Sequence, residues 1–88
     1  MSGRPLKLVY FAWVRERVGR PEETLDVPEN IATVADLAAW LVGRGEEYAY
    51  AFENPGVVRA AIDRVHAKPD ALLGGAREVA FFPPMTGG

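Results

Sequence analysis

The chain has 88 residues, which is enough for one domain with a modest core and too few for two. About half of the residues are apolar and a quarter are charged, as is typical of a folded globular protein. The formal net charge is -2 and the basic residues are scattered along the sequence, which argues against a nucleic-acid-binding protein.

Other compositional features exclude further classes. The sequence has no cysteine, so it forms no disulfide, no thiolate metal site and no thiol nucleophile. The N-terminal segment lacks the pattern of a signal peptide, and no apolar run is long enough to span a bilayer. We therefore expect a cytoplasmic protein that neither enters a membrane nor binds nucleic acid.

The first third of the sequence predicts two strands separated by a short helix. Residues 6–12 (LKLVYFA) are apolar on both alternating faces, so we expect a central strand that is at least partly covered on each face. A short helix over 13–18 should end at Gly19. Residues 22–27 (EETLDV) alternate and are followed by Pro28, which predicts an edge strand.

The clearest element is a helix within TVADLAAWLVGRG, residues 33–45. Apolar residues recur at positions i, i+3, i+4 and i+7 starting from Val34, which is the spacing of one helix face. Thr33 and Asp36 have the spacing of a capping box, and Gly45 fits the far end. This segment therefore predicts the main helix.

The remaining sequence predicts strands with one more helical turn before them. Residues 46–52 favour a short helical turn that ends at the NPG break. Residues 57–63 (VVRAAID) predict a strand, and residues 64–77 predict a short strand and a loop. EVAFF, residues 78–82, predicts the last strand.

The order of these elements predicts an α+β fold. One main helix packed on a mixed sheet of about five strands is the simplest layered arrangement for so short a chain. An antiparallel pair of first strands, followed by a crossover through the main helix toward a parallel partner, gives a ubiquitin-like β-grasp fold. A ferredoxin-like α+β sandwich is the alternative. We expect a domain over residues 1–84 and a flexible C-terminal tail over residues 85–88.

Three stretches resemble the small subunit of molybdopterin synthase, a sulfur carrier with a ubiquitin-like fold. They are LVYFAWVRERVG, TVADLAAWLV and REVAFFPPMTGG. The most specific of them is VAFFPP followed by a short spacer and a Gly-Gly end. Two stretches depart from the family: GGAR stands where a glycine-acid turn is usual, and IDRVHAKPD is more basic than expected.

The resemblance implies that Gly88 is the reacting residue. Its terminal carboxylate would be adenylated by a ubiquitin-activating-like enzyme that uses ATP, and then converted to a thiocarboxylate, a C-terminal 1-thioglycine. The sulfur would pass to a pterin precursor in the large subunit, within a heterotetramer of two small and two large subunits. The chain would then be a non-catalytic subunit of a sulfurtransferase, with no bound cofactor and no metal.

Two sister functions and one unrelated function remain open at this point. The chain could be a sulfur carrier for thiamine thiazole synthesis, or a ubiquitin-like modifier that is joined to lysines. It could also be a β-grasp binding module whose Gly-Gly end is inert.

The resemblance also assigns roles near the C-terminus. Met85, Thr86 and Gly87 would thread the tail into a narrow channel, where residues without a Cβ allow close approach. We assign partner binding to the segment before them: Phe81, Phe82, Pro83 and Pro84. The two phenylalanines alternate along the strand, so one should fill the core and the other should face a partner. The two prolines remove backbone donors and fix φ at about -65°, which ends the strand in a stiff extended segment.

The other conspicuous residues have simpler interpretations. His66 has no cysteine or clustered acids at ligand spacing, so we expect a surface histidine and no metal site. Residues 15–17 (RER) predict the solvated side of the short helix, and Trp13 and Trp40 predict core or groove residues. The sequence offers no recognisable catalytic constellation, so catalysis should reside in partners.

Overall fold

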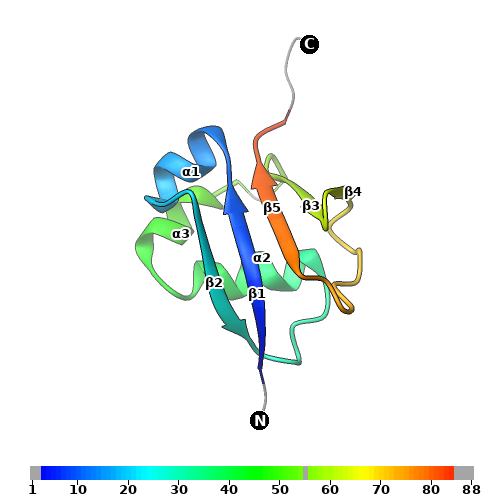
Figure 1. Cartoon of the computed structure of the whole chain (residues 1–88). Helices are drawn as coiled ribbons and strands as arrows, with labels where there is room; N and C mark the ends of the chain where they lie inside the picture. The colour runs from blue at the N-terminus through cyan, green and yellow to red at the C-terminus, as the bar shows by residue number, and fades with distance from the viewer. Residues whose placement is uncertain (1–2, 55, 85–88) are drawn as a thin grey trace.

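The computed structural model describes residues 3–54 and 56–84, and within them it forms a five-stranded mixed sheet and three helices (Figure 1). The strands are β1 (Arg4–Tyr10), β2 (Glu22–Val27), β3 (Arg59–Ile62), β4 (Val65–Ala67) and β5 (Glu78–Phe82). The helices are α1 (Ala12–Val18), α2 (Val34–Val42) and α3 (Glu46–Ala51). The mixed sheet and the main helix confirm the predicted α+β fold class.

The strand order across the sheet is β2-β1-β5-β3-β4. β1 pairs antiparallel with β2 and parallel with β5, and β3 pairs antiparallel with both β5 and β4. The predictions of a central first strand and an edge second strand are therefore confirmed. The parallel partner of β1 is the last strand of the chain, so the first and last strands lie side by side in the middle of the sheet (Figure 1).

The core lies between one face of the sheet and the three helices. β1 contributes Leu6, Leu8 and Tyr10, which are all at most 1% exposed. The helices contribute Val14, Val18, Val34, Leu37, Leu41, Tyr48 and Ala51 to the same cluster. Burying one such Leu or Val side chain stabilises the fold by about 1.5 to 3 kcal/mol. The apolar residues that recur at helical and at strand spacing in the sequence thus pack together in a single core.

The opposite face of the sheet is open in the described residues, so the second face of β1 is covered only in part. On this face Lys7 is exposed and Val9 is only half-buried. In the part of the chain that the structure describes, all three helices place their buried residues in the core on the other side. The apolar residues on the second side of β1 are therefore available to a partner.

The start of α2 has the predicted cap, but its end differs from the prediction. At the start of α2 the Asp36 amide donates to the Thr33 hydroxyl at 3.1 Å, and the Thr33 amide donates to the Asp36 carboxylate at 3.2 Å, so the predicted capping box is present. α2 ends at Val42 with Gly43 as its cap, earlier than predicted. Gly45 instead precedes α3, because a second helix begins at this point.

The short helix α1 ends as predicted but its polar side is only partly solvated. Gly19 caps it with a φ of 91°. Arg15 and Glu16 are exposed, as expected, whereas Arg17 is only partly exposed. The Arg17 guanidinium lies 4.7 Å from the centre of the Trp13 ring and 4.1 Å from that of Tyr50. Trp13 is half-buried against the core, as is Trp40, in agreement with the prediction for both tryptophans.

A tight turn and one carboxylate stabilise the segment from β3 to the start of β5, much of which the sequence predicts as a loop. Asp63 and Arg64 connect β3 to β4 with φ values of 48° and 72°, as in the two-residue hairpin turns that need positive φ. The Asp63 carboxylate accepts hydrogen bonds from the backbone amides of Arg77 and Glu78 at 2.9 and 3.0 Å. These two hydrogen bonds hold the β3–β4 hairpin against the start of β5.

One carboxylate joins the edge strand to the centre of the sheet and to α3. Tyr10 and Tyr48 donate their hydroxyl protons to Glu23 Oε2 at 2.8 and 2.6 Å, and Arg20 Nη1 donates to Glu23 Oε1 at 2.8 Å. The Glu23 side chain is 11% exposed. Burial alone would raise the pKa of Glu23, but the hydrogen bonds from Tyr48, Tyr10 and Arg20 outweigh it and lower the pKa.

Replacing Glu23 with glutamine should therefore destabilise the fold in a pH-dependent way. The carboxylate has a lower pKa in the folded chain than in the unfolded chain, so its contribution is present above the unfolded pKa and is lost as pH falls through the folded pKa. We expect Glu23→Gln to lower the free energy of unfolding by about 1.5 kcal/mol at neutral pH. Urea unfolding should show a smaller difference from the parent chain in strong acid.

The control is Glu29→Gln, which removes an exposed carboxylate of the same kind. That variant should unfold like the parent protein at both pH values. A Glu23→Gln deficit of the same size at neutral pH and in strong acid would show that the charge of Glu23 does not stabilise the fold.

Candidate functional site

The C-terminal strand ends in the middle of the sheet. β5 stops at Phe82, before Pro83 and Pro84, as predicted from the missing backbone donors. Because β5 is parallel to β1, its end lies beside the end of β1, and the Phe11 amide donates to the Phe81 carbonyl at 3.1 Å. The chain thus leaves the sheet between its central strands, next to the start of α1 (Figure 1).

The two phenylalanines of β5 have separate environments. Phe81 is 1% exposed and packs in the core, with its ring centre 5.0 Å from that of Phe52 in an edge-to-face arrangement. Phe82 is half-buried and lies on the open face of the sheet, as the alternation along the strand predicted. Of the two residues, Phe82 is therefore the one that can meet a partner without unfolding the core.

Phe82 belongs to an apolar patch on the open face, which we call the exit surface. Its apolar residues are Val9, Phe11, Ala61, Ala80 and Phe82, which line a shallow hollow of about 440 Å³. The same hollow is bordered by charged side chains: Lys7, Glu22, Arg64 and Glu78. An apolar centre with a polar rim is the usual anatomy of a protein-binding surface.

Phe11 is the residue of this surface that sequence reasoning missed. Its side chain is 49% exposed, although it follows a strand whose other large apolar residues are in the core. The sequence placed Phe11 on the second face of β1, which it predicted to be at least partly covered. Only the parallel pairing of β1 with β5 brings it next to Phe82, and that pairing has no local signal in the sequence.

The remaining predicted site residues are Met85, Thr86, Gly87 and Gly88. They lie outside the described residues, as does the predicted division between a domain and a tail. Pro83 and Pro84 are half-buried at the end of the described chain.

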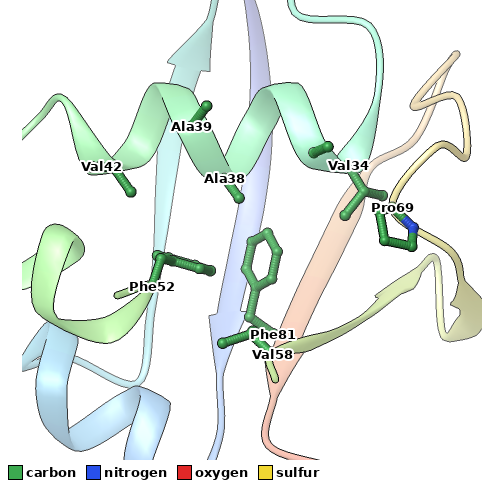
Figure 2. Close-up of a pocket in the computed structure, with 9 residues that line it drawn as sticks. Val34, Ala38, Ala39, Val42, Phe52, Val58, Pro69 and Phe81 are labelled. Carbon is green, nitrogen blue, oxygen red and sulfur yellow. The ribbon is translucent and has the colours of Figure 1, made fainter. Parts of the chain in front are cut away.

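A second hollow, of about 420 Å³, lies on the helix side of the sheet (Figure 2). Figure 2 shows Ala38 and Val42 of α2 facing Phe52, Phe81 and Val58 across it. Every residue that lines it is apolar, so it offers no acid, base or nucleophile. The small side chains of α2 account for the space between that helix and the sheet.

The described residues include no group of three or more His, Cys, Asp and Glu side chains that could hold a metal ion. His66 is exposed, in agreement with its predicted surface position, and its ring centre lies 5.7 Å from that of Phe82. None of the helices in residues 3–54 and 56–84 is long and apolar enough to cross a membrane.

Comparison with known proteins finds one matching family and several similar proteins. The ThiS family matches residues 8–88. The molybdopterin synthase sulfur carrier subunit of Escherichia coli (strain K12) is 36% identical over 83 residues, which cover 94% of this chain and 99% of that protein.

Among solved structures, the chain is similar to a putative molybdopterin converting factor, subunit 1, from Pyrococcus furiosus. The TM-score is 0.71 and the identity 28%, over 92% of this chain and 98% of the other. The small archaeal modifier protein 1 of Haloferax volcanii has a TM-score of 0.67 and 27% identity, over 94% and 100% of the two chains. The family match spans most of the sequence, and the chain therefore belongs to the ThiS family.

Proposed function

We propose that this chain is the sulfur carrier subunit of a molybdopterin synthase. The observation that carries the proposal is the 36% identity to the Escherichia coli sulfur carrier subunit over nearly the full length of both proteins. The described structure supports it with an apolar exit surface beside the point where the C-terminal strand leaves the sheet. A carrier needs both features, because partners must hold the domain while they act on its last residue.

The proposed chemistry takes place at the carboxylate of Gly88. A carboxylate is a poor electrophile, because its charge repels nucleophiles and its leaving group would be oxide. An adenylating partner related to ubiquitin-activating enzymes removes both obstacles: the carboxylate attacks the α-phosphorus of ATP, diphosphate leaves, and a mixed anhydride with AMP remains. A sulfide equivalent then displaces AMP and leaves the 1-thioglycine thiocarboxylate, a soft nucleophile that donates its sulfur to a pterin precursor.

The chain itself supplies recognition in this scheme. The exit surface docks on the large subunit of the synthase, with Phe82 as its apolar anchor, and two small and two large subunits form the heterotetramer. Pro83 and Pro84 restrict the backbone before the tail and so limit the entropy lost on insertion. Gly87 and Gly88 carry no Cβ, which suits a narrow channel in the partner. ATP and the catalytic groups belong to the partners.

Truncating Phe82 should weaken docking without unfolding the domain. Because Phe82 lies on the open face, we expect Phe82→Ala to reduce affinity for the large subunit by about 2 kcal/mol, roughly thirtyfold, with little change in the melting temperature. Calorimetric titration of the large subunit measures this. Leu72→Ala is the control, since Leu72 is 73% exposed and does not line the exit surface.

Equal affinities of Phe82→Ala and Leu72→Ala for the large subunit would place the docking surface elsewhere. Phe81→Ala is a poorer probe, because it empties a core position and should cost about 3 to 5 kcal/mol of stability.

Changing the position of the terminal carboxylate should abolish activation while leaving the fold intact. The last strand ends at Phe82, so deletion of Gly88, or addition of one alanine after it, removes no strand pairing of the described sheet. Each change displaces the carboxylate by about 3.5 Å. Since a misplacement of about 1 Å can cost a hundredfold in rate, ATP-dependent adenylation should become hard to detect.

The measurement is diphosphate release by the adenylating enzyme, with thermal melting as the control for folding. Normal adenylation and normal molybdopterin formation by the alanine-extended chain would show that Gly88 is not the reacting residue.

A second candidate is a ubiquitin-like modifier joined to lysines. It is favoured by the structural similarity to the small archaeal modifier protein 1 of Haloferax volcanii at 27% identity, a lower identity than that to the Escherichia coli carrier. Lysine-linked adducts of this chain in cell extracts would support the modifier. Co-purification with the large synthase subunit, without such adducts, supports the sulfur carrier.

A further inference from the structure

His66 extends the exit surface toward the far edge of the sheet. Ala80 of β5 is paired with Ala61 of β3, and Ala61 is paired in turn with His66 of β4. Paired residues of adjacent strands point their side chains to the same face of a sheet. His66 therefore lies on the open face, at the end of a row that begins in the apolar centre of the exit surface, although it does not line the hollow itself.

The His66 ring also lies against the proposed anchor of the exit surface. Its centre is 5.7 Å from that of the Phe82 ring, and the two ring planes are inclined by 59°. His66 is exposed and Phe82 is half-buried, so the imidazole lies outermost and shields part of the phenyl ring. A partner that covers Phe82 from the open face therefore also meets His66.

The surroundings of His66 do not supply a counter-ion for a protonated ring. Within residues 3–54 and 56–84, no carboxylate oxygen lies within 4.0 Å of its nitrogens. The charged groups near it on β3, the hairpin turn, β5 and the segment after β4 are Arg59, Asp63, Arg64, Glu78, Lys68 and Asp70. The Asp63 carboxylate already accepts hydrogen bonds from two backbone amides, which leaves two acids among three cations.

We infer that His66 is a second contact of the exit surface and that the large subunit covers it in its neutral form, so that docking weakens as the ring gains a proton. The inference rests on the proposed function, because that function supplies the docking partner. Moving a charged group out of water without a counter-ion costs much more free energy than moving a neutral one. Covering Phe82 therefore favours the unprotonated imidazole beside it.

The chain has one histidine, which makes this response separable from other titrations. Histidine has an ordinary pKa of about 6.5, whereas carboxylate, lysine and arginine side chains ordinarily keep their charges between about pH 5.5 and 7.5. A complex that excluded the proton from His66 completely would lose about tenfold in affinity between those two pH values.

The test uses three single variants in calorimetric titrations of the large synthase subunit from the same genome, at about pH 7.5 and about pH 5.5. His66→Gln keeps a neutral polar side chain that cannot gain a proton, and His66→Lys carries a permanent positive charge. Val65→Lys is the matched control on the same strand. Val65 is 68% exposed and is paired with Ile62, which is paired with Val79 of the core, so its side chain is on the opposite face.

We expect the affinity of the parent chain to fall by up to about tenfold from pH 7.5 to pH 5.5, relative to that of His66→Gln at the same two pH values. The comparison cancels titration of the large subunit itself. His66→Lys should bind about tenfold more weakly than the parent at pH 7.5, whereas Val65→Lys should follow the parent at both pH values. All three variants change exposed residues, so their melting temperatures should match that of the parent.

Proton release gives an independent readout. Titrations near pH 6 in two buffers of different ionisation enthalpy should show that docking releases more protons from the parent chain than from His66→Gln. Equal proton release from the two chains would overturn the inference.

The other outcomes separate this inference from the proposed function. If the parent chain binds the large subunit and His66→Lys binds as well as Val65→Lys, the inference is overturned and the proposed function is untouched. If the parent chain does not bind the large subunit at all, the proposed function fails and the inference fails with it. Self-association of the chain that His66→Lys abolishes would assign this face to a second copy, which also overturns the inference.

Discussion

The parallel pairing of β5 with β1 is the constraint on which the rest of the structure depends. It places the last strand in the centre of the sheet, where Phe81 on one side completes the core and Phe82 on the other side faces outward. It also brings the end of β1, and with it Phe11, next to the point where the chain leaves the sheet.

Burial on only one side of the sheet explains how so short a chain can both fold and bind. All three helices in the described residues pack on the face that carries Leu6, Leu8 and Tyr10, and the Glu23 hydrogen bonds hold the edge strand and α3 to that layer. The other face carries no helix of the described residues, so apolar side chains such as Val9 and Phe82 stay half-buried there and Phe11 stays exposed. The residues that stabilise the fold and those proposed for recognition thus lie on opposite faces of the sheet. A change in binding caused by substituting Phe82 can therefore be interpreted without a large change in the stability of the fold.

Features that depend on neighbouring residues were predictable from the sequence. The capping box of Thr33 and Asp36, the end of α1 at Gly19, and the opposite faces of Phe81 and Phe82 each follow from local geometry. The resemblance of the C-terminal segment to a known family supplied the functional hypothesis, which no local geometry could supply.

Several features that depend on distant residues were not predictable. Alternating apolar residues in β1 indicate that both faces are apolar, but they do not tell a face covered by the chain's own helices from one that awaits a partner. The position of Arg17 between Trp13 and Tyr50 requires α1 and α3 to be neighbours. The contact between His66 and Phe82 requires the β3–β4 hairpin to lie beside β5, although the basic character of that stretch was visible in the sequence.

The most direct test of the sulfur carrier proposal is the intact mass of the protein isolated from its own cells while they make molybdenum cofactor. The proposal predicts a population in which one oxygen of the terminal carboxylate is replaced by sulfur, localised to the C-terminal peptide by fragmentation. It further predicts that this population disappears when the adenylating enzyme is removed. A mass that stays unmodified in cells with an active pathway would contradict the proposal.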